Sequence, residues 1–476
     1  MPGRPPHRRR PPRPPAASGD GPAVEATIES IAAGGEGVAR LPDGRVVFVH
    51  RTAPGERVRL QVQAQHRQWA RGRLLQVLQP SPERRDAPCP HYADCGGCTL
   101  EHLDYAAQLR AKARIAHDAL TRIGGLRLPL PEIVASPREF QYRNRVSFAL
   151  RRLGGGRVVA GFHALGEPER IVDIDGACRL PEPAIGAVWD RLRAAWGENA
   201  GRLPAGERLR LTLRATAAGE VTLLVEGGGT PGEPETLLGA VEGLSAVWHR
   251  PRAVAPPALL AGAAGLAEAW GDEELEVSGA AFLQVNRLAA ELLAAHVLEL
   301  AGSVAGARVV DAYCGVGLYA RKLARQGAQV IGIELDALAV AEARRTAPPG
   351  ARFEAGAVEA LLPAALPADL VILNPPRAGV APEIADALLR QPPHRLIYVS
   401  CNPATLARDL RRLQPALHIE SVRCFDLFPQ TAHVETVVSG VGLPASGFRL
   451  PASDNTRGSP AAGSRKPEAS SPTPDP

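Results

Sequence analysis

A cysteine between an apolar strand and a helix is the residue of this sequence most suited to covalent chemistry. The run LIYVS predicts a strand that ends at Ser400, and Cys401 follows it directly. Asn402 is a favoured helix N-cap and Pro403 suits the first helical position, so a helix is expected to begin there. The positive end of a helix dipole lowers the pKa of a nearby thiol. Cys401 is therefore a candidate nucleophile, although a lone cysteine is more often a small buried apolar residue.

A glycine-rich loop indicates a cofactor that contains adenosine. VVDAYCGVGLYA carries Gly315, Gly317 and Ala320 as a G-x-G-x-x-A loop between a strand and a helix. Glu334 ends the next strand, where a carboxylate binds the ribose of a dinucleotide or of S-adenosylmethionine (SAM). Asp311 favours SAM, because a carboxylate at that strand end would face an ammonium group well and a pyrophosphate poorly. On these residues alone an NAD-linked oxidoreductase is the alternative.

The combination of a methyl donor and a thiol indicates methylation of a pyrimidine at carbon 5. Asn374 opens NPPRAG, which is typical of a methyltransferase active-site loop. Enzymes that methylate amino nitrogens have an aromatic residue after Asn-Pro-Pro, whereas Arg377 follows here, and they do not need a cysteine. A thiolate that adds to carbon 6 activates carbon 5, and a base must then remove the carbon-5 proton. FPQTAHVETV offers His433 and Glu435 for that step. A glutamate that begins an apolar strand is more often a surface charge, but beside Cys401 Glu435 becomes a plausible base.

Cysteine spacing predicts a separate metal centre. CPHYADCGGC contains Cys89, Cys95 and Cys98 in the pattern C-x5-C-x2-C, and thiolates select zinc or iron–sulfur clusters. Both centres usually have four ligands, so a fourth must come from elsewhere. Cys178 is one candidate, and His91 is another for zinc. The spacing does not decide between the two metals.

The N-terminal segment predicts a small β-barrel. Residues 24–78 contain five apolar runs separated by turn residues, which is typical of an OB-like barrel that binds single-stranded RNA. Trp69 and Arg71 lie in HRQWARGR, where base stacking and phosphate contact would combine. A purely structural barrel with a solvated basic hairpin is the alternative.

The C-terminal half predicts the sheet that positions the chemistry. Residues 137–278 mix strands with one helix, whereas the rest of the chain alternates continuous apolar strands with helices. That alternation indicates a doubly wound, mostly parallel sheet, which binds ligands at the carboxyl ends of its strands. Asp311, Glu334, Asn374 and Cys401 all fall at such ends.

Composition limits the partners and the cellular compartment that the protein can have. The 476 residues are 45% apolar and carry a formal net charge of +5, which permits a nucleic-acid partner. No apolar run approaches the roughly 18 residues of a membrane span, and the basic N-terminus lacks the apolar stretch of a signal peptide. Seven cysteines are an odd number and do not resemble a secreted disulfide framework. We expect a cytoplasmic protein without a membrane partner, and no obligate protein partner is inferred.

Together these features resemble the SAM-dependent RNA uracil-C5 methyltransferases, which make 5-methyluridine in ribosomal and transfer RNA. The matching stretches are FLQVN (282–286), DAYCGVG (311–317), NPPRAG (374–379), YVSCNPATLARDL (398–410) and FDLFPQTAHVE (425–435). The predicted N-terminal barrel resembles the TRAM domain of this family. The three spaced cysteines together with Cys178 resemble its [4Fe–4S] site.

The resemblance also implies roles for individual residues. It implies Cys401 as the nucleophile, Glu435 as the base, and Phe282 near a uracil flipped out of the RNA. The implied SAM contacts are Gln284, Tyr313, Glu334 and Asn374. Two positions depart from the family pattern: Leu318 stands where many members have a polar residue, and Ala357 stands where an Asn is expected.

The resulting expectation is an α/β enzyme with a Rossmann-like SAM methyltransferase domain behind a TRAM-like barrel and a mixed α+β central domain. The expected bounds are a disordered basic tail (1–20), the barrel (21–80), the central domain with the cysteines (81–278), the methyltransferase domain (279–442) and a disordered tail (443–476). Its expected cofactors are SAM and a [4Fe–4S] cluster. The expected substrate is a uridine of 23S ribosomal RNA, with the T-loop of transfer RNA or a noncatalytic RNA-binding role as alternatives.

Overall fold

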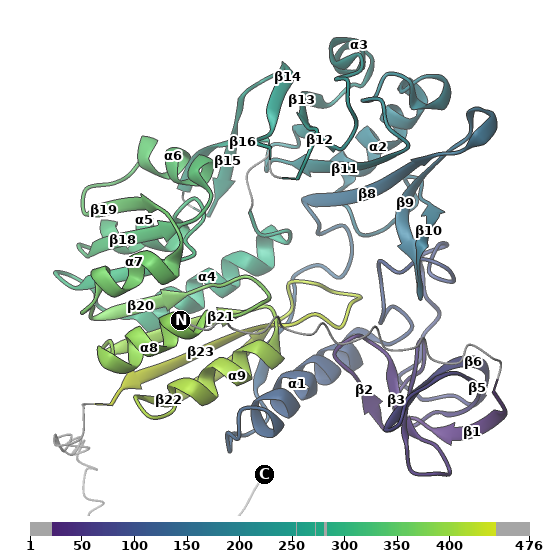
Figure 1. Ribbon diagram of the computed structural model, residues 1–476, viewed down its shortest axis with the longest axis horizontal. Coiled ribbons are helices and arrows are strands. Elements are labelled where there is room, and N and C mark those ends of the chain that lie inside the picture. Colours follow the sequence, from purple (N-terminus) through teal and green to yellow (C-terminus); the bar gives the residue numbers. More distant parts are fainter. Residues whose placement is uncertain (1–20, 254, 272, 280–282, 444–476) are drawn as a thin grey trace, which may run out of the picture. The chain divides into compact units, whose positions relative to one another are not determined.

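The structure is a computed structural model that describes residues 21–253, 255–271, 273–279 and 283–443 (Figure 1). Phe282 and the two predicted tails, apart from Leu443, lie outside these residues. Within the described ranges, no helix is both long and apolar enough to cross a membrane.

The N-terminal segment forms a six-stranded sheet around its own apolar core. The sheet order is β1-β5-β6-β4-β3-β2. Its strands are β1 (Ala23–Thr27), β2 (Ser30–Ile31), β3 (Gly37–Arg40), β4 (Val46–Val49), β5 (Arg57–Gln65) and β6 (Trp69–Gln79). The first predicted strand is divided in two, because its pairing partner changes there: the backbone N–H of Ile28 still donates to the carbonyl of Glu56 beside β5, whereas that of Glu29 donates to Val38 on β3. Alternate residues of β5, such as Val58 and Leu60, are fully buried, as expected for a sheet with one solvated face.

The central segment forms a seven-stranded sheet in the order β10-β9-β8-β11-β12-β13-β14. Its strands are β8 (Arg145–Arg152), β9 (Val158–Ala164), β10 (Glu167–Asp173), β11 (Arg208–Ala215), β12 (Val221–Glu226), β13 (Leu244–Arg250) and β14 (Ala258–Gly262). Helices α2 (Pro183–Ala195) and α3 (Pro234–Ala240) contribute to its core. A hairpin of β15 (Gly265–Trp270) and β16 (Glu273–Ser278) follows.

The C-terminal segment forms the predicted doubly wound sheet, in the order β19-β18-β17-β20-β21-β23-β22-β7 (Figure 1). The parallel strands are β17 (Arg308–Ala312), β18 (Gln329–Glu334), β19 (Ala351–Ala355), β20 (Leu370–Leu373) and β21 (Arg395–Ser400). Strand β23 (Glu435–Gly442) lies between β21 and β22 (Leu417–Phe425) and is antiparallel to both. The edge strand β7 (Glu132–Val134) comes from the N-terminal half of the chain. The domain bounds inferred from the sequence stay a prediction.

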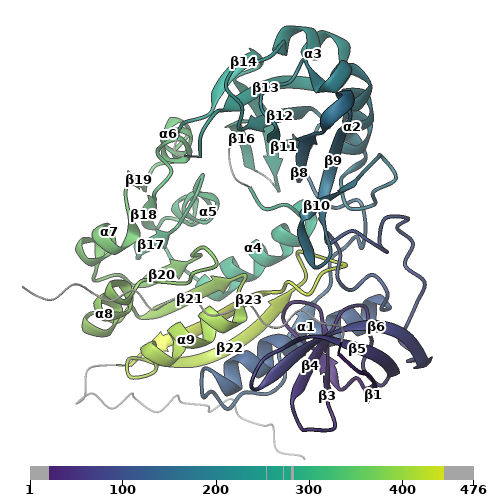
Figure 2. The same cartoon turned by 45° about the vertical axis from the view of Figure 1, so that its right-hand side comes forward.

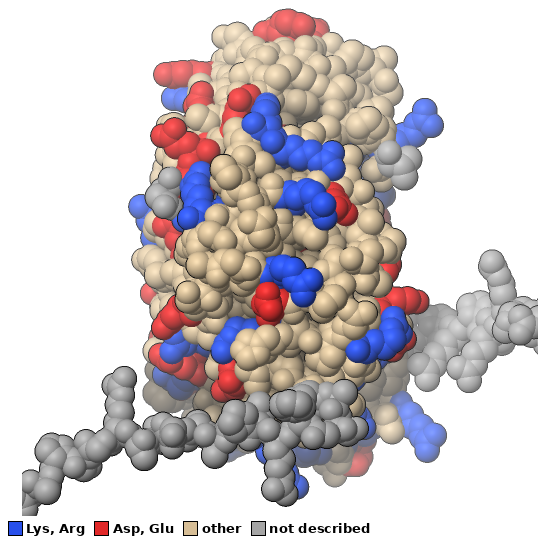
Figure 3. Space-filling view, turned by 90° about the vertical axis from the view of Figure 1, so that its left-hand side faces the viewer, with Lys and Arg blue, Asp and Glu red and all other residues tan. Residues whose placement is uncertain are grey.

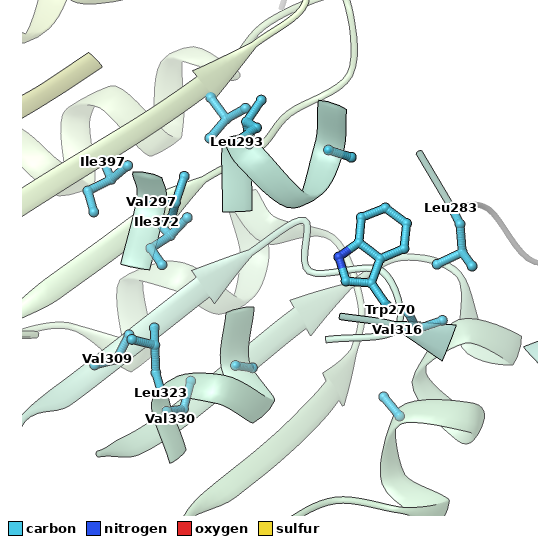
Figure 4. Close-up of a cluster of buried hydrophobic side chains, with 14 of the residues drawn as sticks. Trp270, Leu283, Leu293, Val297, Val309, Val316, Leu323, Val330, Ile372 and Ile397 are labelled. Carbon is cyan, nitrogen blue, oxygen red and sulfur yellow. The ribbon is translucent and has the colours of Figure 1, made fainter. Parts of the chain in front are cut away.

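Helices cover both faces of this sheet, because successive strand residues point to opposite sides. On one face Val309, Ile372 and Ile397 pack with residues of the helices after the central segment (Figure 4). These helices are α4 (Arg287–Ala301), α5 (Leu318–Arg325) and α6 (Ala337–Arg345). On the other face Val310 and Leu396 pack beneath the remaining helices. The latter are α1 (Tyr105–Arg122), α7 (Val358–Ala365), α8 (Pro382–Arg390) and α9 (Pro403–Leu413), with α1 beside α9 (Figure 2).

Charge is mixed on the face of the molecule that Figure 3 presents. Lysine and arginine side chains alternate there with aspartate and glutamate, and neither sign forms a continuous patch. The small net positive charge is therefore not concentrated on this face.

Candidate active site

The strand register places the candidate nucleophile beside the candidate base. Strands β21 and β23 pair antiparallel with Ser400 opposite Thr436. The next residue of one strand, Cys401, therefore lies opposite the preceding residue of the other, Glu435. The two groups interact electrostatically, since the Glu435 carboxylate raises the pKa of the Cys401 thiol. Two residues 34 positions apart in the chain thus meet at one end of the sheet.

The helix predicted after Cys401 is confirmed as α9. The Asn402 side chain caps it by accepting from the backbone N–H of Ala404 at 3.1 Å. Asn402 also donates through Nδ2 to the carbonyl of Arg377 at 3.1 Å, and Thr405 donates to the same oxygen at 3.1 Å. The helix N-terminus therefore fixes NPPRAG, the loop after β20, against the loop of Cys401.

Burial controls the thiol of Cys401. Desolvation is the largest effect and raises the thiol pKa, Glu435 raises it further, and the guanidinium of Arg377 lowers it. The expectation that a helix dipole leaves this thiol with a lowered pKa is wrong for the protein without RNA, because desolvation outweighs the favourable charges. Sequence reasoning used Arg377 only against nitrogen methylation and did not foresee its position beside the thiol.

Glu435 has the environment of a general base that works near neutral pH. Its side chain is 4% exposed, and burial raises its carboxyl pKa to about 7 in opposition to the guanidinium of Arg377. The imidazole of His433 accepts at Nε2 from Arg377 at 3.3 Å. Burial and the charge of Arg377 lower the His433 pKa to about 4, so His433 is neutral and a weak base. Of the two candidates, Glu435 is the better matched to proton removal.

Replacing Arg377 with glutamine is expected to make Cys401 less reactive. The variant loses the cation that lowers the thiol pKa, so the thiolate fraction at pH 8 falls and alkylation by iodoacetamide slows by about 3- to 10-fold. Mass mapping of the Cys401 peptide measures this rate without interference from the other cysteines. Arg390→Gln, at an exposed site on α8, is the control, and equal rates in the two variants would contradict the assignment.

The predicted cofactor residues come together at the carboxyl ends of β17 and β18. The Glu334 carboxylate accepts from the backbone N–H of Gly315 at 3.0 Å, which joins the glycine loop to the acidic residue. Gly317 has a φ of 78°, and a Cβ there would overlap the ring of Phe353, so only glycine fits. Asp311 is fully buried, accepts from Ala320 through Oδ2, and has no partner for Oδ1.

Burial raises the pKa of the Asp311 carboxyl to about 7, the carboxylate of Glu334 raises it too, and no basic side chain of the described residues lowers it. An unpaired, buried carboxylate oxygen at this position fits the ammonium group of a bound SAM. Tyr313 adopts a φ of 64°, which is uncommon for a residue with a side chain, and Asn374 is tied by its backbone N–H to the carbonyl of Ala312. The backbone carbonyl of Gln284, which precedes α4, accepts from the side chain of Asn144 at 3.0 Å.

The two positions that depart from the family pattern are helix starts. Leu318 is the first residue of α5 and packs partly against the core, and Ala357 is the N-cap of α7 without a side-chain bond. Neither side chain offers a polar contact to a cofactor.

All four predicted cysteine ligands line one small cavity. These are Cys89, Cys95, Cys98 and Cys178. Burial raises the pKa of each thiol, to about 12 for Cys178. Among the residues that the structure describes, no three cysteine, histidine or carboxylate side chains are grouped so that they could hold a metal ion.

The predicted RNA-contacting residues lie at the start of β6, which pairs with β5 on one side and β4 on the other. Trp69 stacks on His66 with ring centroids 3.8 Å apart, and the guanidinium of Arg71 lies 5.9 Å from the Trp69 ring centre. Arg71 is exposed and Trp69 is partly exposed, so both are open to a partner.

Comparison with known proteins gives consistent matches along the chain. The family model for tRNA (uracil-5-)-methyltransferases matches residues 364–443, that for TRAM domains matches residues 20–75, and that for a methyltransferase domain matches residues 309–392. An uncharacterized RNA methyltransferase of Gloeobacter violaceus is 37% identical over 449 residues, which cover 89% of this chain and 98% of that protein. One of Halalkalibacterium halodurans is 32% identical and covers 87% of this chain and 96% of its own.

A solved structure shares this fold over most of the chain. The crystal structure of Pyrococcus abyssi tRNA (uracil-54, C5)-methyltransferase, in complex with S-adenosyl-L-homocysteine, superposes with a TM-score of 0.68. It is 26% identical, and the match covers 88% of this chain and 100% of that one. Taken with the cysteine, the cofactor loop and the TRAM match, these relatives show that the chain is a SAM-dependent enzyme belonging to the tRNA/rRNA uracil-5 family of RNA methyltransferases that carry a TRAM domain.

Proposed function

We propose that this enzyme methylates carbon 5 of a uridine in RNA through a covalent bond between Cys401 and carbon 6 of the base. The observation that carries the proposal is the register of β21 and β23, which sets Cys401 opposite Glu435 at the end of the sheet where Asp311 and Glu334 lie. A nucleophile, a base and the cofactor residues are then gathered around one point, as covalent catalysis with methyl transfer requires.

The chain's own residues supply the nucleophile and the base of that reaction. The thiolate of Cys401, stabilised by Arg377, adds to carbon 6, and the electrons of the carbon 5–carbon 6 double bond move onto carbon 5. Bound SAM would supply the electrophilic methyl group that carbon 5 takes up, and the electrons of its broken S–CH3 bond would stay on the departing sulfur. Glu435 then accepts the carbon-5 proton, the electrons of that C–H bond re-form the double bond, and the C–S electrons leave with sulfur.

Carbon 6 is reached from above the plane of the base, so the uridine must leave its stack in the RNA. The resemblance to the family implies Phe282 near the flipped uracil, and we propose that Trp69 and Arg71 contact flanking nucleotides. Gln284, Tyr313, Glu334 and Asn374 are proposed to contact SAM together with Asp311, Gly315 and Gly317. Gln284 rests on the resemblance alone, whereas the others are supported by their location at the ends of adjacent strands and in the glycine loop.

The first candidate substrate is 23S ribosomal RNA. The test incubates anaerobically purified protein with methyl-labelled SAM and separated, unmodified 23S ribosomal RNA and transfer RNA, and then maps the labelled nucleoside. Label in ribosomal RNA as 5-methyluridine is the expected result. Bound SAM without label in either RNA would favour the noncatalytic RNA-binding alternative.

Transfer RNA is the second candidate, because the similar solved structure is that of an enzyme acting on uracil 54 of transfer RNA. That match covers 88% of this chain, so the N-terminal sheet alone does not distinguish the two substrates. Label in transfer RNA alone would keep the mechanism and change the substrate.

We further propose that the four cysteines hold a [4Fe–4S] cluster rather than zinc. The support is the resemblance of the cysteine pattern to the cluster site of the family, together with the cavity that all four cysteines line. Four thiolates are the ligand set that such a cluster takes. Such a cluster would join the segment of Cys89–Cys98 to that of Cys178, and methyl transfer itself requires no redox step.

Metal analysis of protein purified without oxygen tests the cluster. We expect about four iron and four sulfide ions per chain, and a marked loss of iron in Cys178→Ser. Cys424→Ser is the matched control, because that buried cysteine lies on β22, away from the cavity. Zinc in place of iron, or unchanged iron in Cys178→Ser, would contradict the proposal.

A further inference from the structure

The loop between β22 and β23, residues 426–434, leads directly into Glu435, and one of its residues has an unusual backbone. We call residues 426–434 the base loop. Gln430 in this loop is fully buried and has a φ of 68°. A residue with a Cβ adopts such a φ at a cost in free energy, and glycine would adopt it without that cost. A glutamine at this position therefore indicates that its side chain is needed there.

Hydrogen bonds use every polar atom of that side chain. Oε1 of Gln430 accepts from Arg85 at 3.0 Å and from Nε2 of Gln108 at 2.9 Å. Nε2 of Gln430 donates to the carbonyl of Glu139 at 3.3 Å, and its backbone N–H donates to Oε1 of Gln108 at 2.9 Å. The side-chain amide of Gln108, on α1, thus bonds both the side chain and the backbone N–H of Gln430.

The backbone of Gln430 binds the segment that follows the cysteine motif. Its carbonyl accepts from the N–H groups of Thr99 and Leu100, both at 2.9 Å. The hydroxyl of Thr99 accepts in turn from the N–H of Ala432 at 3.2 Å, and Tyr142 donates to the carbonyl of Pro429 at 2.9 Å. Segments that are hundreds of residues apart in the sequence therefore hold the centre of the base loop from several sides.

A second anchor holds the start of the same loop. Lys112, also on α1 and fully buried, donates to Asp426 at 2.5 Å and to the carbonyl of Phe428 at 3.0 Å. With one end bound to α1 and the other continuing into β23, the base loop has little freedom, and Gln430 fixes its middle.

We propose that Gln430 is a positioning residue for proton removal, which holds the base loop so that Glu435 faces carbon 5 of the uracil. This proposal rests on the proposed function above. It assigns Gln430 no contact with the RNA or with SAM: its effect passes through the backbone to Glu435, five residues later. Loss of its side chain should therefore slow the last step of the reaction more than the steps before it.

Gln430→Gly and Gln430→Asn separate the side chain from the backbone. Both residues tolerate the left-handed φ, so the turn itself is preserved, while neither reaches Arg85 and Gln108 as glutamine does. We expect turnover on the substrate RNA to fall about 10- to 100-fold, with a covalent protein–RNA complex that accumulates and resists denaturing electrophoresis. The dissociation constant for SAM should change by less than about twofold.

RNA that carries 5-fluorouridine at the target position provides the second measurement. Fluorine cannot leave carbon 5 as a cation, so trapping of the complex reports addition and methyl transfer without proton removal. Both variants should trap this RNA at the wild-type rate. Gln108→Glu tests the same contact from the side of α1. Its carboxylate still accepts from the backbone N–H of Gln430 but can no longer donate to Oε1 of Gln430. This variant should therefore show the same slow turnover with normal trapping.

Gln414→Ala is the matched control, since Gln414 also joins two segments through a backbone carbonyl, that of Gly124 at 3.2 Å, but lies at the end of α9. Normal turnover in both Gln430 variants would overturn the proposal. An equal loss of trapping and turnover would also overturn it, because that result indicates a general loss of folded protein. Failure of the proposed function looks different: wild-type protein would then trap no RNA.

Discussion

Cys401→Ala is expected to transfer no methyl group to RNA, with turnover lower than that of wild type by at least about 10⁴-fold. Carbon 5 of a uracil is a poor nucleophile until a thiolate adds to carbon 6, and alanine offers nothing to add. Cys401 is half-buried outside the N-terminus of α9, so its loss removes few packing contacts and the fold should survive. Methyl transfer from labelled SAM to the substrate RNA measures the effect.

SAM binding and RNA trapping distinguish loss of the nucleophile from misfolding of the Cys401→Ala variant. Binding of SAM should be unchanged, and trapping of 5-fluorouridine RNA should disappear. Cys424→Ser is the control: Cys424 is buried on β22, bonded across the strand pair to Thr436, and is expected to keep its activity as serine. An active Cys401→Ala protein would end the covalent mechanism, while a protein that no longer binds SAM would point to misfolding.

Glu435→Gln is expected to stop the reaction one step later. The amide cannot accept the carbon-5 proton, so the methylated base stays attached to Cys401 and a covalent protein–RNA complex accumulates. Turnover should fall by about 10² to 10⁴-fold, the usual contribution of a positioned base. Denaturing electrophoresis with labelled RNA detects the complex. Wild-type turnover in this variant would transfer the role of base to another group.

The pH dependence of that step follows from the burial of Glu435. Its carboxyl pKa is about 7, and the charged or titratable groups around it are Arg377, Cys401, Tyr319 and, through Arg377, His433. A base must be ionised, so release of the methylated RNA from the preformed complex should accelerate as pH rises to about 7 and level off above it. The same rate in Glu435→Gln should be low and independent of pH.

Ionisation of Glu435 should speed proton removal but lower the folding stability of the protein. A carboxyl whose pKa rises from 4.5 in the unfolded chain to about 7 in the folded one disfavours folding once it ionises, by up to about 3 kcal/mol. That cost is absent below pH 4.5 and complete above pH 7. Glu435→Gln should therefore have a higher Tm than wild type at pH 8, and the difference should vanish at pH 4.

Local rules predicted the parts of the site that local sequence determines. Asn402 and Pro403 predicted the start of α9, and the glycine loop predicted the turn before α5. Apolar runs separated by helices predicted the parallel sheet, whose carboxyl ends carry Asp311, Glu334 and Cys401. In each case the signal and the structure it specifies lie within a few residues of each other.

Long-range packing determined the rest. No local pattern states that Ser400 lies opposite Thr436, that Arg377 lies beside the thiol, or that burial outweighs the helix dipole at Cys401. The buried pair of Lys112 and Asp426 was equally invisible, since its members are 314 positions apart. The resemblance to a family supplied Glu435 as the base before any contact was known, and the structure adds a physical reason for that choice.

The position of β23 has a consequence for the time at which the enzyme becomes active during synthesis. This strand, the last of the described residues, enters the sheet between β21 and β22 rather than adding to an edge. A growing chain presents its earlier segments for folding first, so β21 and β22 leave the ribosome before the strand that belongs between them. Until it arrives, Cys401 has no partner across the strand pair. On the proposed mechanism, a nascent chain that already holds Cys401 and the glycine loop is unable to complete methylation until the strand that begins with Glu435 has inserted.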